Sequence, residues 1–200
     1  MEAANLKHFG VDYGAKLAGT TAVAMLHQAQ LQVWQCQKGQ DADSWLLQLT
    51  ADLQPKIMYM DAPLTLPGVY SQTPYAVSSD FFYRQADREL GAMSPMFIGG
   101  LTARAIKLRV QLAEKGVGLL ETYPAALAKL LLQLPEGYKK SLATLPTCVE
   151  SLQGLLPFPL KERPQNWHQF DAILAWLSGY RHVMGQSVLY GDAKEGRIIV

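Results

Sequence analysis

The sequence predicts an α/β fold built on one mixed β-sheet. Three short apolar runs with short connections come first, which is typical of an antiparallel meander, and two further apolar runs each follow a stretch of helical periodicity. The 200 residues, of which 49% are hydrophobic and 18% charged, are enough to bury a substantial core. We therefore expect a single domain over residues 1–200, with a helical insertion at about 64–116.

The first half of the chain supplies four predicted strands and one helix. The strands are expected at residues 7–12, 20–25, 31–35 and 57–60. Before the fourth strand, apolar residues recur at helical spacing from Trp45 to Leu53, behind Asp41, which is a suitable helix cap. Because this helix acts as a crossover, the fourth strand should lie centrally in the sheet and run parallel to the first.

The rest of the chain supplies four longer predicted helices, one short one and the last strand. The helices are expected at about 79–90, 101–112, 124–134 and 166–185, and the strand at 117–120. The last helix has a near capping box, with Asn166 as the cap and Gln169 three residues later. The stretch from 134 to 164 holds five prolines and two glycines, so we expect a connector there with one short helix near 148–152.

The order of these elements is that of the RNase H-like topology. It predicts a mixed five-stranded sheet, three antiparallel strands followed by two parallel ones, flanked by helices and with a helical insertion after the fourth strand. In this arrangement the first and fourth strands are adjacent and parallel. Ligands of open α/β sheets gather beyond the carboxyl ends of such strands, so this edge is where we expect a functional site.

Four acidic residues stand where an apolar run stops or a helix begins. Asp12, Asp61 and Glu121 follow the first, fourth and fifth strand runs, and Asp171 lies early in the last helix, beside its buried stripe. Several carboxylates converge in a core only when cations neutralise them, and Mg²⁺ and Mn²⁺ prefer such hard oxygen ligands. The four acids therefore predict a divalent-metal site.

These residues also resemble a family, the predicted RNase H-like nucleases catalogued as domain of unknown function 429. The motifs that carry the resemblance are Gly-Val-Asp12, Asp61-Ala62-Pro63, Arg84-x-x-Asp87, Glu121-Thr122-Tyr123-Pro124 and Asp171-Ala172. The resemblance implies a fold shared with RuvC-type resolvases and RNase H, whose acidic residues hold two magnesium or manganese ions. It also implies a nucleic acid, DNA or RNA, as the partner.

The resulting hypothesis is a metal-dependent nuclease, a hydrolase with two ions about 3.5–4 Å apart on either side of the scissile phosphate. Asp12 would bridge both ions, and Asp61 and Asp171 would each bind one. Glu121 would be a further ligand or would orient the attacking water.

Two arginines complete the predicted site. Arg84 and Arg88 lie one helical turn apart and are expected to face substrate phosphates, with Asp87 fixing one of them. The alternative is an ordinary helical ion-pair face of Arg84, Asp87 and Arg88. His168 lies one turn before Asp171, where it could bind an ion or shuttle protons, although an exposed first-turn histidine is the commoner arrangement.

Two other functions stay open. Asp12-Tyr-Gly14 followed by Gly19-Thr20-Thr21 is similar to the phosphate-binding hairpin of actin-like ATPases and sugar kinases, which favours an ATP-binding module. The third reading is a catalytically silent RNase H-like domain that keeps the acids for stability. Removal of magnesium separates these readings, because a filled carboxylate cluster is stabilised by its ion through mass action.

The composition of the sequence limits where the protein is located and what it binds. The sequence has no apolar stretch long enough to span a membrane, and Cys36 and Cys148 form no CxxC pair, so we expect a cytoplasmic protein with reduced thiols and no membrane partner. A formal net charge of +1 lacks the strong basic excess of many nucleic-acid binders. The oligomeric state is open, with a homodimer among the options.

Overall fold

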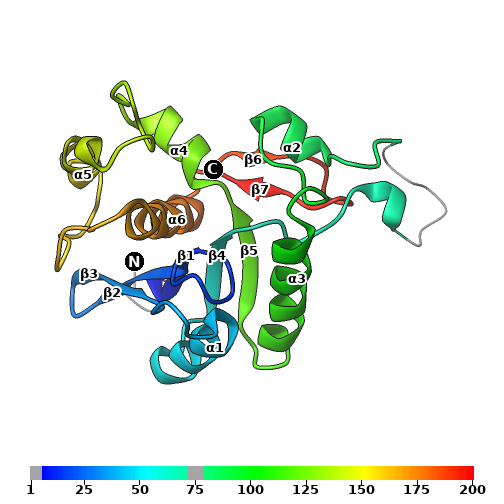
Figure 1. Ribbon diagram of the computed structural model, residues 1–200, viewed down its shortest axis with the longest axis horizontal. Coiled ribbons are helices and arrows are strands. Elements are labelled where there is room, and N and C mark those ends of the chain that lie inside the picture. Colours follow the sequence, from blue (N-terminus) through cyan, green and yellow to red (C-terminus); the bar gives the residue numbers. More distant parts are fainter. Residues whose placement is uncertain (1–5, 72–78) are drawn as a thin grey trace.

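The computed structural model describes residues 6–71 and 79–200 and centres on one mixed β-sheet (Figure 1). Its strands are β1 (His8–Asp12), β2 (Ala22–His27), β3 (Gln30–Gln35), β4 (Ile57–Asp61), β5 (Gly118–Thr122), β6 (Leu189–Tyr190) and β7 (Ile198–Ile199). They lie in the order β3-β2-β1-β4-β5-β7-β6. β2 is antiparallel to β1 and β3, whereas β4 is parallel to β1 and β5. The RNase H-like mixed sheet predicted from the sequence is thus confirmed.

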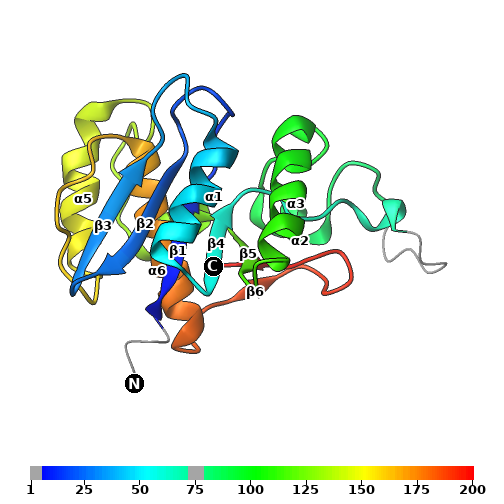
Figure 2. The same cartoon turned by 90° about the horizontal axis from the view of Figure 1, so that it is seen from below.

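Helices cover both faces of this sheet. They are α1 (Ala42–Leu53), α2 (Gln85–Leu90), α3 (Gly99–Ala113), α4 (Pro124–Leu131), α5 (Leu145–Gln153) and α6 (Trp167–Val183), with two short 3-10 turns, η2 (Gly68–Tyr70) and η3 (Leu142–Thr144). α1 and α3 lie on one face, and α4, α5 and α6 lie on the other (Figure 1, Figure 2). Within the described ranges, no helix combines the length and the apolar character that crossing a membrane requires.

The alternation of side chains along each strand decides which face a residue serves. Val11 in β1 and Met60 in β4 belong to the core under α1 and α3. The next residues along these strands, Asp12 and Asp61, therefore point to the opposite face, which α6 covers.

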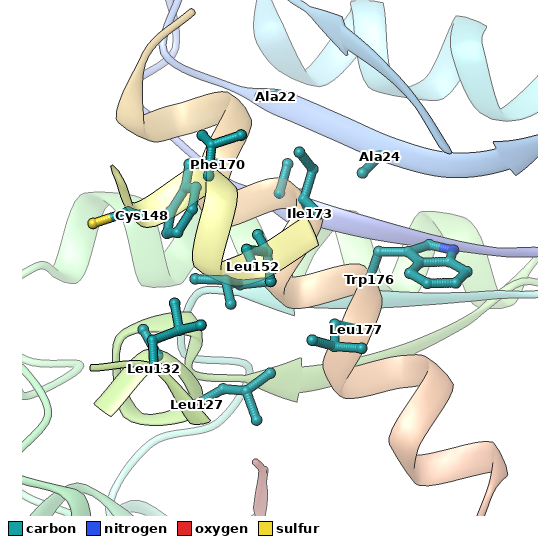
Figure 3. Close-up of a cluster of buried hydrophobic side chains, with 14 of the residues drawn as sticks. Ala22, Ala24, Leu127, Leu132, Cys148, Leu152, Phe170, Ile173, Trp176 and Leu177 are labelled. Carbon is teal, nitrogen blue, oxygen red and sulfur yellow. The ribbon is translucent and has the colours of Figure 1, made fainter. Parts of the chain in front are cut away.

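Helix α6 lies directly against β1. Gly10 makes this approach feasible, because a Cβ atom at that position would stand only 2.0 Å from the backbone nitrogen of Trp176. Asn166 caps α6 by accepting a hydrogen bond from the backbone N–H of Gln169, as the sequence predicts. Figure 3 shows the apolar side chains of α6 packed with those of α4 and α5. Together these contacts hold the first turns of α6 beside the carboxyl end of β1.

The helix predicted at 79–90 forms only from Gln85 onward. The Asp80 carboxylate accepts hydrogen bonds from the backbone N–H groups of Phe82 and Tyr83, at 2.8 and 3.0 Å, and this local turn competes with helix formation. Residues 72–78 of the predicted insertion lie outside the described residues.

The sheet continues beyond the fifth predicted strand. β7 pairs in parallel with β5, and β6 pairs antiparallel with β7. Each has only two residues, too few to show the alternating pattern that identifies a strand in a sequence. The connector at 134–164 contains α5, which is longer than predicted. Beyond α5 the connector runs beside β3, where the backbone N–H of Leu31 donates to the carbonyl of Pro159 at 2.9 Å.

Candidate metal centre

Three carboxylates meet beyond the carboxyl ends of β1 and β4. Asp12 and Asp61 are directly paired residues on these parallel strands and point to the same face of the sheet. Asp171 reaches the same place from the early turns of α6. One carboxylate oxygen from each residue lies within 4.8 Å of the other two. The structure thus brings together three of the four acids predicted from the sequence, and we call them the aspartate triad.

Two members of the triad have a basic neighbour. Oδ2 of Asp12 is 2.7 Å from Nδ1 of His168, and Oδ2 of Asp171 is 2.5 Å from Nζ of Lys139. The Asp61 carboxylate forms no hydrogen bond or ion pair with any residue of the ranges 6–71 and 79–200. The second oxygen of Asp171, Oδ1, is buried without a hydrogen-bond partner within these same ranges. Two positions in the triad therefore lack the partner that a buried carboxylate needs.

The environment of the triad disfavours negative charge. Burial, followed by the charges of Asp12 and Asp171, raises the pKa of Asp61 well above its ordinary value. Burial also raises the pKa of Asp171 to about 6, although Lys139 opposes this shift. The pKa of Asp12 is raised by burial, against the lowering effect of its hydrogen bond with His168. Without a further cation, burial therefore disfavours the charged form of all three carboxyl groups.

The residues present fit a hard divalent cation. The ligand set offers only carboxylate oxygens, which suits Mg²⁺ and Mn²⁺ and argues against softer ions that select thiolate or imidazole ligands. The bare oxygen of Asp171 and the unpaired carboxylate of Asp61 are the two features that a cation would satisfy. Such an ion would also remove the repulsion that raises the pKa of Asp61.

Glu121 does not join the triad, and this corrects the prediction that it is a metal ligand. Its partner in the register of β4 and β5 is Met60, one residue before Asp61, so its side chain points to the opposite face of the sheet. There both of its oxygens accept from the guanidinium of Arg84, at 2.6 and 2.7 Å, and one also accepts from the backbone N–H of Leu64.

Arg84 is a buried structural residue, so the prediction that it faces a substrate phosphate does not fit. Its side chain has no exposed surface, and its five N–H donors all have acceptors. Besides Glu121, the acceptors are both oxygens of Asp87 and the hydroxyl of Thr65. Asp87 thus fixes Arg84, but it holds the arginine in the protein interior and not toward a substrate.

Arg88 is the arginine that remains accessible. Its side chain is 59% exposed, it pairs with Asp80 at 2.7 Å, and its guanidinium carbon lies 3.7 Å from the ring centroid of Tyr83. The alternative, an ordinary helical ion-pair face, holds only for Arg84 and Asp87, which pair at a spacing of three residues but are buried, whereas Arg88 pairs with Asp80 and is exposed.

The two basic neighbours of the triad differ in how far the sequence indicates them. The sequence offers His168 as an ion ligand or proton shuttle beside the commoner exposed first-turn histidine, and in the structure the 43% exposed side chain contacts Asp12 from the first turn of α6. Its spacing of three residues from Asp171 places the two on one side of the helix, and this was the available signal. Lys139 gave no such signal, because it lies in the proline-containing connector, 32 residues before its partner.

The loop after β1 does not favour the ATP-binding alternative. The backbone N–H groups of Gly14 and Ala15, which a phosphate would need, already donate to the hydroxyls of Thr21 and Thr20 at 3.0 and 3.2 Å. A guanidinium nitrogen of Arg104 also donates to the carbonyl of Gly14 at 3.0 Å. The segment that is similar to a phosphate-binding hairpin is therefore a loop whose backbone N–H groups bond within the loop and are not free for a phosphate.

A pocket of about 210 Å³ opens beside the two strand-borne carboxylates. Its lining includes Asp12, Asp61, Tyr13, Tyr123 and Met93. Side chains from β1, β4, the segment after β5 and the insertion therefore share one opening, through which a small ligand can reach Asp12 and Asp61.

The raised pKa of Asp171 predicts a pH dependence of the metal-free protein. Since the folded state binds this proton more tightly than the unfolded chain, the stabilisation is complete below about pH 4 and is lost as the pH rises through about 6. The raised pKa of His168, caused by its hydrogen bond with Asp12, acts in the same direction.

Urea unfolding in EDTA at pH 5 and pH 7.5 tests this. We expect the free energy of unfolding of Asp171→Asn, relative to the unmodified protein, to increase by roughly 1–3 kcal/mol between the two pH values. An equal difference at both pH values would show that Asp171 titrates normally.

Comparisons with known proteins add little to this geometry. No protein-family model matches the sequence, and neither does any curated protein. Among solved structures, the chain is similar to the yeast mitochondrial Holliday junction resolvase Ydc2, with 13% sequence identity and a TM-score of 0.44 over 90% of this chain and 79% of that one. This likeness is too weak to bear on activity, and the order and direction of the strands remain the basis of the RNase H-like assignment.

Proposed function

We propose that this protein is a divalent-metal-dependent phosphodiesterase that cleaves nucleic acid, with Asp12, Asp61 and Asp171 as its metal ligands. The observation that carries the proposal is the convergence of three carboxylate oxygens within 4.8 Å at the edge of an RNase H-like sheet. The exposed pocket beside Asp12 and Asp61 supports it further, since a ligand can approach there.

The side chains around the triad have separate parts in this proposal. A bound Mg²⁺ or Mn²⁺ supplies Lewis acidity toward a phosphoryl oxygen and lowers the pKa of water in its coordination shell. An ionised Asp12 only accepts hydrogen bonds, so Nδ1 of His168 carries the proton of their contact and Nε2 is left to exchange protons. The His168 side chain is 43% exposed, so this exchange can involve water or a leaving oxygen. Of the two arginines predicted to contact substrate phosphates, we keep only Arg88 in this role.

The nucleic-acid substrate and membership of the family catalogued as domain of unknown function 429 belong to the same proposal. Both rest on the motifs around Asp12, Asp61, Arg84, Glu121 and Asp171. In this chain Glu121 and Arg84 are bound to each other, which suits a role in shaping the pocket wall. A cytoplasmic location stays a prediction, to which the free buried thiols of Cys36 and Cys148 conform.

Cleavage assays on a nucleic-acid panel test the proposal. The panel consists of single-stranded DNA, duplex DNA, a four-way junction, RNA and an RNA–DNA hybrid, each incubated with Mg²⁺, Mn²⁺ or EDTA. We expect cleavage of at least one substrate with a divalent ion, none in EDTA, and a loss of about 100-fold or more in Asp12→Asn, since even residues outside the ligand set typically cost 10–100-fold. Equal activity of Asp12→Asn and the unmodified protein would remove the mechanism.

The silent-domain alternative predicts a different result. A domain that keeps its acids for stability alone should show no metal-linked change in melting temperature and no cleavage on any member of the panel. Measurement of the melting temperature with and without Mn²⁺ therefore accompanies the assay.

A further inference from the structure

A lysine already forms an ion pair with one member of the aspartate triad. Nζ of Lys139 lies 2.5 Å from Oδ2 of Asp171, and the two side chains are 31% and 9% exposed. The lysine side chain therefore stays partly exposed where it pairs with Asp171, while Oδ1 of the same carboxylate is buried without a partner in the described part of the chain.

The backbone directs Lys139 to this position. Its φ of +60° lies in the left-handed region, which residues with a side chain seldom adopt and which surrounding contacts must hold in place. The turn contains Gly137, also at positive φ, whose carbonyl accepts from the backbone N–H of Lys140 at 2.9 Å. The neighbouring Tyr138 packs edge-on against Trp167 of α6, with ring centroids 5.2 Å apart. The loop is thus anchored to the helix that carries Asp171.

We propose that Lys139 is a built-in counter-ion of the metal-free site and that a divalent ion must displace it from Asp171 in order to bind. The inference rests on the metal site of the proposed function. An ion on either oxygen of Asp171 would lie beside the Lys139 ammonium. The positive charges of the ion and the ammonium would then repel each other strongly, because little water separates them. The lysine side chain can leave, because its flexible four-carbon stem is partly exposed while its backbone stays anchored.

Displacement has a measurable consequence for ion affinity. Breaking the ion pair between Lys139 and Asp171 opposes binding of the ion, so removal of the lysine charge should strengthen binding. A lysine that instead positions Asp171 for the ion would give the opposite result, since its removal would free the carboxylate to rotate away. The sign of the change in affinity therefore decides between the two roles.

The first experiment measures Mn²⁺ affinity by electron paramagnetic resonance in the full chain. We expect Lys139→Met and Lys139→Gln to bind Mn²⁺ roughly five- to tenfold more tightly than the unmodified protein, at the lower end of the roughly 5–150-fold that is typical of coupled binding. Lys139→Gln keeps a polar side chain without the charge, so it separates charge from contact. Lys140→Met is the matched control, because Lys140 is the exposed neighbour on the same turn, and its affinity should stay unchanged.

The second experiment uses the unmodified protein and needs no folded variant. Lysines are acetylated briefly with an amine-reactive ester, in EDTA or in saturating Mn²⁺, and the modified positions are quantified by mass spectrometry. We expect the acetylation rate of Lys139 to rise several-fold with Mn²⁺, while that of Lys140 stays the same. An unchanged or lower rate at Lys139 would overturn displacement.

The outcomes also separate this inference from the proposed function. Mn²⁺ binding that is equal or weaker in Lys139→Met than in the unmodified protein overturns the counter-ion role alone. No Mn²⁺ binding in any variant overturns both the counter-ion and the metal site. Tighter binding in Lys139→Met together with an unmodified protein that cleaves no nucleic acid supports the counter-ion and overturns the nuclease.

Discussion

Replacement of Asp61 by asparagine should abolish the stabilisation of this protein by divalent ions. An ion present at 100 times its dissociation constant contributes about 2.7 kcal/mol to a protein that binds it only when folded, which corresponds to roughly 5–10 °C in melting temperature for a domain of this size. Asp61→Asn should lose nearly all of this shift and about 100-fold or more of any cleavage activity. The reason is that the triad then keeps only two of its three carboxylates.

The same substitution should raise the melting temperature in EDTA. Asp61 is the member of the triad whose pKa is raised by burial and by the charges of both other aspartates, so a neutral amide relieves repulsion in the metal-free state. Differential scanning calorimetry with and without Mn²⁺ measures both effects. Asp52→Asn is the control, because it removes one carboxylate from the exposed end of α1 and should leave the Mn²⁺ shift intact. A full Mn²⁺ shift in Asp61→Asn would show that the ion binds elsewhere.

Replacement of Arg84 by methionine should be the most destabilising single change. It leaves the buried carboxylates of Glu121 and Asp87 without their cation, and loss of one partner of a buried ion pair typically costs about 3–5 kcal/mol. For a domain of this size the melting temperature should fall by roughly 6–20 °C. Thermal unfolding followed by circular dichroism measures this fall.

Two further variants make the result specific. Arg88→Met removes an exposed arginine from the same short helix and should change the melting temperature far less. The double variant Arg84→Met with Glu121→Gln should regain part of the loss, because the amide removes one of the unpaired buried charges. Equal effects of Arg84→Met and Arg88→Met would contradict the structural role of the buried pair.

The central part of the fold and most of the triad could be predicted from the sequence. Asp12 and Asp61 end apolar runs, and parallel strands bring such ends to one edge of a sheet. Asp171 stands beside the apolar stripe of a well-capped helix, where a lone carboxylate needs a partner.

The misplacement of Glu121 has a definite physical cause. Strand ends are known from a sequence only to within a residue or two, whereas one residue decides which face of the sheet a side chain serves. Glu121 pairs with Met60 and so has the parity of the apolar residues under α1 and α3. A prediction that counts parity back from the buried Leu119 would have separated it from Asp61.

The buried arginine and the lysine of the triad were out of reach for a different reason. Asp87 is a local partner of Arg84, but the burial of Arg84 also requires Glu121, 37 residues later, and nothing local to the helix indicates this second partner. Lys139 is directed by a left-handed backbone conformation in a connector without periodicity. Both depend on contacts between distant segments, which local patterns do not encode.

Because of the contact at Gly10, the distance between the metal ligands depends little on how well the core side chains pack. Where α6 crosses β1 at Gly10, main chain rests on main chain, so at this point no Cβ atom separates the strand bearing Asp12 from the helix bearing Asp171. Trimming neighbouring core residues would loosen the domain while the crossing distance stays the same. A methyl group added at position 10 would do the reverse, since it would push the helix outward and pull the ligands apart within an otherwise well-filled interior.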